Sequence, residues 1–169
     1  MELWDAYDKT GNKLGFDLVR DEPIPENIYH IVVEIFVFST DGKVLVTQRH
    51  PDKSWSLKWE NTGGSILKGE TPEQGAVREL QEETGIRITE ADLCPLYTEV
   101  IHPAIYKCYR VFVDSSVEVH LQEGETVDYK WLPHAEFMKF IKTNDFVLRI
   151  GENILRHIDA FEKLVRHKK

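Results

Sequence analysis

The chain has 169 residues, of which 41% are hydrophobic and 30% charged, and its formal net charge at pH 7 is −8. This length suits a single domain over residues 1–169 with a substantial core. The negative net charge argues against a nucleic-acid polymer or an anionic membrane surface as partner, because both bind a basic patch. A small phosphorylated partner can still bind, because a bound metal ion reverses the sign of the local electric field.

The N-terminal segment and the cysteines indicate the compartment. The first 15 residues contain acidic side chains and no long apolar run, which argues against a signal peptide or a membrane span. Cys94 and Cys108 lie far apart and form no CxxC motif. We therefore expect a cytoplasmic protein in which both cysteines are small core residues without a disulfide.

The first predicted elements are strands. Apolar segments at 3–7 and 14–19 flank a turn-rich stretch, which predicts an N-terminal β-hairpin at an edge of the sheet. Residues 28–38 form a β-branched and aromatic run with almost no polar interruption, as in a strand at the centre of a sheet. Asp41-Gly42 marks a tight turn into the next strand, residues 43–48, and a loop follows over 50–59.

A helix with clear start and stop signals comes next. Thr71 is the N-cap candidate, Pro72 occupies the first helical position, and Gln74 completes a capping box with Thr71. Gly85 ends the helix.

The remaining chain returns to strands and ends in helices. Strands are predicted near 93–100, 105–113 and 127–132, and the rest is helical in period. The order of elements fits an α/β/α sandwich around a mixed β-sheet. An apolar face near the C-terminus covers the core or forms the seam of a homodimer, the core being favoured; its residues are Leu148, Ile150, Ile154, Leu155, Ile158, Phe161, Leu164 and Val165.

The predicted helix carries an unusual cluster of acids. Glu79, Glu82 and Glu83 project from one face, whereas Val77 and Leu80 fall on another. Three neighbouring carboxylates repel each other, and a divalent cation relieves that repulsion. Oxygen ligands suit magnesium, manganese or calcium, and magnesium commonly also binds substrate phosphates. The pattern therefore predicts a metal site that acts on a phosphorylated substrate.

Residues 64–86, GSILKGETPEQGAVRELQEETGI, resemble the complete Nudix box. Every fixed position is filled: Gly64, Glu70, Arg78-Glu79-Leu80, Glu82-Glu83 and Gly85-Ile86. A merely solvated acidic helix face would not require those glycines, or Glu70 and Arg78, at their places. The resemblance to the Nudix hydrolase superfamily implies its sandwich fold and an Mg²⁺-dependent pyrophosphohydrolase, with Mn²⁺ as the alternative metal. The implied substrate is a nucleoside diphosphate linked to another moiety, or a related small diphosphate.

The resemblance also implies roles for single residues. Glu79, Glu82 and Glu83 would be the metal ligands, joined by the backbone carbonyl of Gly63, with Glu82 closest to the metal and the nucleophilic water. Arg78 would hold a ligand carboxylate in one rotamer.

The box has further supporting positions beside these ligands. Glu70 would support the loop and the helix, and Gly64 and Gly85 would meet backbone requirements.

Residues outside the box complete the expected site. Family members often recruit a later acid, and here the candidates are Glu123, Glu125 and Asp128, of which we favour Glu125. A basic cluster precedes the box, namely Arg49, His50, Lys53 and Lys58. Arg49 is the favoured phosphate contact in this cluster.

Two tryptophans before the box are candidates for the rest of the substrate. Trp55 and Trp59 have rings that suit stacking on a base or lining a lipid-like tail. For Trp59, a core position is the equal alternative.

Two other functions stay open. WDAYDKTGNKLG, Tyr29-His30 and the VTQR segment at 46–49 resemble the isopentenyl diphosphate isomerase branch of the superfamily. Its members carry an essential cysteine just before the box, where this chain has WENTG at 59–63. A non-catalytic nucleotide-binding Nudix domain is the second alternative, although such domains usually have a degraded box.

Overall fold

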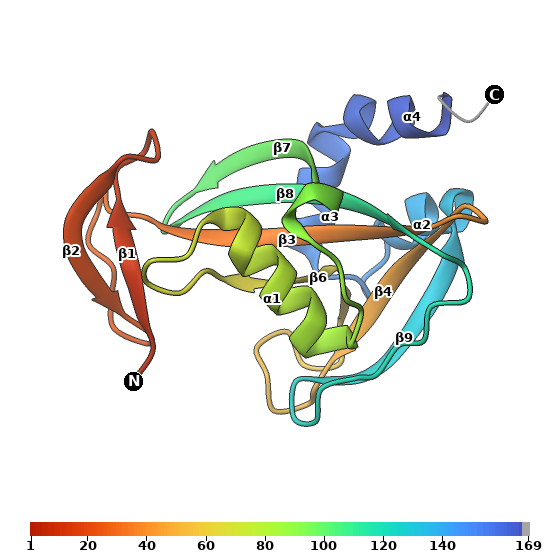
Figure 1. Cartoon of the computed structure of the whole chain (residues 1–169), viewed down its shortest axis with the longest axis horizontal. Helices are drawn as coiled ribbons and strands as arrows, with labels where there is room; N and C mark the ends of the chain where they lie inside the picture. The colour runs from red at the N-terminus through yellow and green to blue at the C-terminus, as the bar shows by residue number, and fades with distance from the viewer. Residues whose placement is uncertain (167–169) are drawn as a thin grey trace.

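The structure is a computed structural model that describes residues 1–166, with the side chains of 163–166 outside the description. Figure 1 shows the elements, which follow in this order: β1 (Leu3–Tyr7), β2 (Lys13–Val19), β3 (His30–Ser39), β4 (Lys43–Arg49), β5 (Trp59–Glu60), β6 (Thr62–Ser65), α1 (Pro72–Thr84), the 3₁₀ turn η1 (Glu90–Asp92), β7 (Cys94–Ile101), β8 (Ala104–Val113), β9 (Thr126–Pro133), α2 (His134–Phe140), α3 (Leu148–Arg156) and α4 (Ile158–Arg166). The predicted strands and the predicted box helix are all present, with ends that differ by a few residues.

β3 is the centre of a mixed sheet, as its apolar composition predicts. It pairs in parallel with β8 along its whole length, and antiparallel with β6 and with β4. β4 in turn pairs with β5 and β9, and β7 pairs with the far side of β8. Because β3 has a core on each face of the sheet, both sets of its side chains are buried, and it needs the continuous run of Val, Ile and Phe that the sequence supplies.

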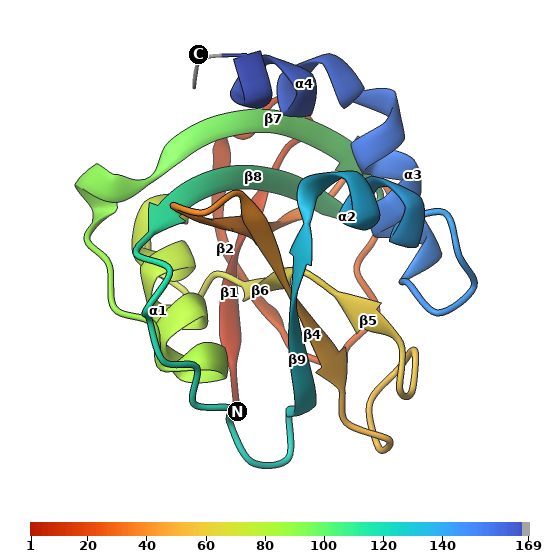
Figure 2. The ribbon, with the colours of Figure 1, turned by 90° about the vertical axis from the view of Figure 1, so that its right-hand side faces the viewer.

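The side chains of β3 alternate between two cores. Val33, Ile35 and Val37 belong to the core beneath α1, whereas Phe36 and Phe38 belong to the core beneath α2, α3 and α4. This alternation follows from the two-residue period of a strand. Figure 2 shows α1 on one side of the sheet and the C-terminal helices on the other. The predicted α/β/α sandwich is confirmed.

α1 begins and ends where its sequence predicts. Thr71 Oγ1 accepts a hydrogen bond from Gln74 N at 3.2 Å, and Gln74 Oε1 accepts one from Thr71 N at 3.0 Å. Gly85 ends the helix with a φ of +72°, and its N–H donates to Gln81 O at 2.9 Å. These caps fix the helix ends and hence the direction in which the box glutamates project.

The predicted N-terminal hairpin is confirmed, and β1 and β2 form a separate two-stranded sheet at one end of the molecule (Figure 1). A bridge between Tyr7 and Tyr29 joins it to the start of β3. The Trp4 ring stacks on the His30 ring, with centroids 4.3 Å apart. The hairpin is therefore packed on the domain and is not a loose extension.

One cysteine lies elsewhere than the sequence predicts. Cys108 is buried in β8, but Cys94 is exposed. Cys94 is the first residue of β7, which lies at the edge of the sheet, and its side chain is left exposed by the residues that the structure describes. Both cysteines are free thiols in the structure.

The C-terminal helical segment is divided, which the apolar period does not predict. His157 separates α3 from α4 and has non-helical backbone angles. Leu148 and Leu155 are exposed because they lie off the stripe of α3 that packs on the sheet, and the predicted positions Leu164 and Val165 lie outside the described side chains. The face that does pack on the core includes Ile150, Ile154 and Phe161. Among the described helices, none combines the length and apolar content needed to cross a bilayer.

Candidate catalytic cleft

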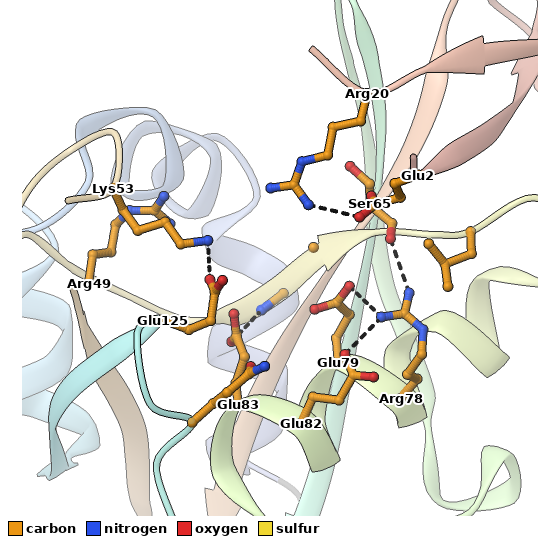
Figure 3. A pocket seen from close by; sticks show the side chains of 14 residues that line it. Glu2, Arg20, Arg49, Lys53, Ser65, Arg78, Glu79, Glu82, Glu83 and Glu125 are labelled. Carbon is orange, nitrogen blue, oxygen red and sulfur yellow. Dashed lines mark hydrogen bonds and ion pairs between the residues drawn. The ribbon is translucent and has the colours of Figure 1, made fainter.

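A polar cleft of about 380 Å³ lies where α1, β6, the N-terminal hairpin and two loops meet. α1 contributes Glu79, Glu82 and Glu83 to its wall. Figure 3 shows basic side chains from the hairpin and from the loop after β4 reaching toward these glutamates. The fold therefore brings the predicted metal-binding acids and cationic side chains into one cavity.

The three glutamates border the cleft but do not converge. Glu79 Oε1 and Glu82 Oε2 accept hydrogen bonds from the same nitrogen, Nη1 of Arg78, at 2.8 and 3.1 Å. Glu83 Oε2 instead accepts a bond from Gly63 N at 3.3 Å. Within residues 1–166, no three His, Cys, Asp or Glu side chains gather closely enough to form a ready metal site. Like charges separate when only Arg78 and backbone groups are present to bind them.

The electrostatics of these acids fit a cation. Burial raises the pKa of Glu83 well above its usual range, and the neighbouring Glu60 and Glu79 raise it further. Burial also raises the pKa of Glu79, against the lowering effect of Arg78. Buried carboxylates that oppose one another's ionisation are stabilised by a hard divalent ion, and oxygen donors suit Mg²⁺ or Mn²⁺. The donor set therefore fits the metal that the box implies.

Arg78 is the hub that positions these acids. Its Nε and Nη2 donate to the two carboxylate oxygens of Glu70 at 2.7 and 3.0 Å, and Nη2 also donates to Ser65 O at 3.1 Å. Glu70 Oε2 in turn accepts from Leu67 N at 2.8 Å. The hydrogen bond with Glu70 is the main cause of the raised pKa of Arg78. A guanidinium held at so many points has one orientation, which in turn orients Glu79.

Two glycines of β6 allow the backbone to approach the site. A Cβ at Gly63 would lie 2.2 Å from Val33 O of the neighbouring strand. A Cβ at Gly64 would lie 2.5 Å from the carboxylate carbon of Glu79. Any side chain there would displace the glutamate or the strand, so the sequence needs glycine at both positions.

Besides Arg78, three cations of the described chain border the cleft, and each is paired with one acid. Arg49 Nη1 donates to both oxygens of Glu60 at 2.6 and 2.8 Å, and Arg20 Nη1 lies 2.8 Å from Glu2 Oε2. The third pair is Lys53 with Glu125. Sequence reasoning included Arg49 and Lys53 but missed Arg20 and Glu2, because only the docking of the hairpin brings them to the cleft.

Among the three later acids, the structure places Glu125 in the cleft wall. Glu123 and Asp128 are exposed, and Asp128 Oδ1 accepts a hydrogen bond from Tyr129 N at 2.8 Å. Glu125 forms an ion pair with Lys53, another residue of the cleft wall.

A second cavity of about 360 Å³ adjoins the first and shares Arg49, Gly63, Gly64 and Ser65 with it. Its wall includes Trp55 and Asn61, and the Asn61 amide makes no hydrogen bond within the described part of the chain. Polar and aromatic groups thus extend the site beyond the glutamates.

Of the two positions that the sequence left open for Trp59, the structure shows the core position. It is 6% exposed and packs against Phe140, with ring centroids 6.1 Å apart. As the first residue of β5, it points into the core beneath the C-terminal helices. Its burial favours packing over substrate contact, so we do not retain it as a substrate residue.

Two members of the predicted basic cluster face elsewhere. Lys58 donates to the backbone carbonyl of Asn144. His50 Nδ1 lies 3.5 Å from Asp52 Oδ2. Neither belongs to the wall of the cleft.

Known proteins resemble this chain over most of its length. A family model for the NUDIX domain matches residues 28–150. An uncharacterised Nudix hydrolase of Listeria monocytogenes is 27% identical over 150 residues, 87% of this chain and 89% of the relative. An isopentenyl-diphosphate Delta-isomerase of Salmonella heidelberg is 28% identical over 114 residues, 60% of this chain and 61% of the isomerase. The crystal structure of DR0079 from Deinococcus radiodurans superposes with a TM-score of 0.76 at 20% identity, covering 92% of this chain and 99% of that one. The chain therefore belongs to the Nudix hydrolase family.

Proposed function

We propose that this protein is an Mg²⁺-dependent pyrophosphohydrolase that cleaves a nucleoside diphosphate linked to another moiety, or a related small diphosphate. One observation carries the proposal: the three box glutamates border the same cleft as three cations that lie outside the box, Arg20, Arg49 and Lys53. Acids alone would bind a metal, and cations alone would bind a phosphate. A cleft with both suits a metal-bound diphosphate, and Mn²⁺ is the alternative ion.

Glu79, Glu82, Glu83 and the Gly63 carbonyl would hold the metal. Bound Mg²⁺ would screen the charge of the diphosphate, activate a water molecule and stabilise the leaving oxygen. The Glu82 side chain is 47% exposed and forms an ion pair with Arg78. This exposure lets it reach a water molecule in the cleft. Glu82 would accept the proton that the attacking water loses.

The remaining groups act on the substrate or on neighbouring side chains. Arg49 and Lys53 would donate hydrogen bonds to phosphate oxygens as negative charge develops on the leaving group. Glu125 pairs with Lys53 and would serve as a second proton acceptor. Arg78, which donates hydrogen bonds to Glu79 and Glu82, would position these two acids. The adjoining cavity would take the part of the substrate beyond the phosphates.

A substrate panel tests this function. The purified protein is incubated with Mg²⁺ and with nucleotide sugars, dinucleoside polyphosphates, ADP-ribose, NADH, oxidised dNTPs and prenyl diphosphates. We expect phosphate-containing cleavage products from at least one nucleoside diphosphate derivative, and none when the metal is chelated. Turnover that persists with chelator would contradict the metal-dependent mechanism.

The isomerase alternative has specific observations for and against it. The similarity to isopentenyl-diphosphate isomerases over 114 residues favours it. However, Cys108 is buried beside Glu34 and Cys94 lies exposed at the edge of the sheet, and neither belongs to the wall of the cleft. In the panel above, interconversion of prenyl isomers without phosphate release would support the isomerase. Tight nucleotide binding without turnover would instead support a non-catalytic domain.

Several other expectations stay predictions. These are the cytoplasmic location, the single-domain organisation over residues 1–169 and the homodimer. The absence of nucleic-acid and membrane partners is likewise a prediction from the net charge of −8.

A further inference from the structure

The N-terminal hairpin lies outside the part of the chain that the NUDIX model matches, residues 28–150, yet it reaches the cleft. Glu2, just before β1, and Arg20, just after β2, both border the cavity that holds the box glutamates. We propose that this hairpin is a wall of the substrate site and that Arg20 binds a phosphate group of the substrate. The inference rests on the proposed function, because it assigns a residue to the same diphosphate.

The hairpin is attached to the loop of the Nudix box itself. Lys68 N donates to Leu3 O at 2.9 Å, and Gly69 N donates to Asp5 Oδ2 at 2.9 Å. The Lys68 ammonium also lies 2.6 Å from Asp17 Oδ2 of β2. Both strands are therefore tied to the loop between β6 and α1, so the position of the hairpin is fixed relative to the box helix.

Arg20 has donors available at the end of this fixed element. Its Nη1 lies 2.8 Å from Glu2 Oε2, and its backbone N–H donates to Glu2 O at 3.0 Å. In the described part of the chain, Nε and Nη2 of Arg20 form no hydrogen bond, and the side chain is 49% exposed. Figure 3 shows the guanidinium extending over the cleft on the side opposite the loop of Lys53. A planar guanidinium with free donors suits the bidentate recognition of a phosphate.

Glu2 can release Arg20 without losing all its partners. Glu2 Oε1 accepts a hydrogen bond from Trp4 Nε1 at 2.8 Å, while Oε2 binds Arg20. A phosphate that enters the cleft can replace Oε2 at the guanidinium, and the indole still holds the carboxylate. The Glu2–Arg20 pair therefore keeps Arg20 near the cleft when no substrate is bound, and competes weakly with a doubly charged ligand.

The charges in the cleft give a reason for the presence of Arg20 in addition to Arg49 and Lys53. Glu79, Glu82 and Glu83 repel an incoming diphosphate until a metal is bound, and Arg49 and Lys53 lie on the side of the loop after β4. Arg20 supplies a positive charge from the hairpin side. Phosphate oxygens that face away from the glutamates thereby meet cations on both sides.

The test compares four variants: Arg20→Ala, Arg20→Lys, Glu2→Gln and Lys9→Ala. Binding of methylenediphosphonate in the presence of Mg²⁺ is measured by calorimetry, and KM and kcat are measured with the best hydrolysed substrate. We expect Arg20→Ala to weaken binding and raise KM by about 10- to 100-fold with a smaller change in kcat, because it removes charged hydrogen bonds to a bound phosphate. Arg20→Lys should lie between this variant and the wild type.

The other two variants separate phosphate binding from a structural role. Glu2→Gln removes the competing charge, so we expect equal or tighter binding of methylenediphosphonate. Lys9 is exposed at the turn of the hairpin and outside the cleft, so Lys9→Ala loses the same charge with no effect on Kd or KM.

Two results would overturn the proposal. One is an unchanged Kd for Arg20→Ala. The other is an equal loss of binding in Glu2→Gln and Arg20→Ala, because the pair would then act only as a tether. Failure of the proposed hydrolase is a separate result: no substrate would be cleaved, whereas methylenediphosphonate binding would still fall in Arg20→Ala.

Discussion

At the scale of single residues, Arg78 explains how three neighbouring acids are held together beside the cleft. Its three nitrogens bind Glu70, Glu79 and Glu82 at once, and Ser65 O fixes the plane of the guanidinium. The side chain of Arg78 is only 22% exposed, so these ion pairs are poorly screened by water. Its contribution is therefore to position the acids more than to bind a ligand.

The first prediction concerns this positioning. Arg78→Ala should lower kcat/KM by about 10- to 100-fold and weaken Mg²⁺ binding, because Glu79 and Glu82 lose their common partner. Arg78→Lys should recover part of the rate, because the charge returns without the planar fork. Steady-state kinetics and Mg²⁺ titration measure both effects. Arg87→Ala, at an exposed position just beyond the box, is the matched control, and equal behaviour of the two alanine variants would exclude a role for Arg78.

The second prediction concerns Glu82. Glu82→Gln keeps the volume and removes the charge, so most turnover should be lost while the thermal unfolding temperature changes little. An initial-rate assay and a melting curve measure the two quantities. Glu152→Gln on α3 changes an exposed acid away from the cleft and should leave the rate unchanged. Full activity of Glu82→Gln would remove this residue from the mechanism.

At the scale of elements, α1 depends on how it ends. Gly85 has a φ of +72°, and a Cβ there would lie 3.0 Å from His120 Cβ. Any other residue at position 85 would therefore have both a strained backbone and a close contact with His120. Glu82 and Glu83 lie less than one helical turn before this position. The end of the helix and the geometry of the acids are thus linked.

The third prediction compares two glycines. Gly85→Ala should lower the free energy of unfolding by at least about 1 kcal/mol, because alanine opposes a positive φ. Gly124 has a φ of +79° but open space around it, so Gly124→Ala carries the backbone strain alone. Urea denaturation should therefore rank Gly85→Ala as the less stable variant. If Gly85→Ala were as stable as Gly124→Ala or more so, the contact with His120 would be relieved without loss of stability.

The elements that sequence could predict are those with local signals. Thr71, Pro72 and Gly85 define α1 because capping is decided by neighbours a few residues away. The apolar run of β3 defines the central strand for a similar reason. Cys94 was misplaced because the exposure of a strand residue depends on pairing between distant segments. For Trp59 the sequence left the core and the substrate site as equal alternatives, because its contact with Phe140 also joins distant segments.

The candidate site divides in the same way. Glu79, Glu82, Glu83 and Arg78 were predictable because a fixed spacing on one helix determines their common face. Arg20 was not, since it lies 44 residues before the first residue of the box, in a hairpin whose docking depends on contacts such as Lys68 with Asp17. No local pattern carries that information.

At the scale of the whole molecule, His30 links the stability of the fold to pH. It lies where the hairpin meets β3, is 8% exposed and stacks on Trp4. Burial lowers the pKa of His30 from 6.5 to about 4. The imidazole is therefore neutral in the folded protein over a pH range in which it is protonated in the unfolded chain.

The fourth prediction follows from the sign of this shift. Between about pH 4 and 6.5 the unfolded chain binds the extra proton, so His30 contributes a loss of stability as pH falls through this range. The full effect is on the order of 3 kcal/mol. His30→Phe retains a ring to stack on Trp4 but does not titrate, so the unfolding free energy of this variant should depend less on pH in this window. Parallel pH profiles for the two proteins would exclude His30 as the source.

Arg49 has a consequence for the size of ligand that the enzyme accepts. It borders both cavities, and its contacts with Glu60 and Ser54 hold the guanidinium at their boundary. An inhibitor with one anionic arm and one neutral arm would have to bend around this side chain. Linker length between the arms, more than the affinity of either arm, would then decide how tightly such a two-headed compound binds.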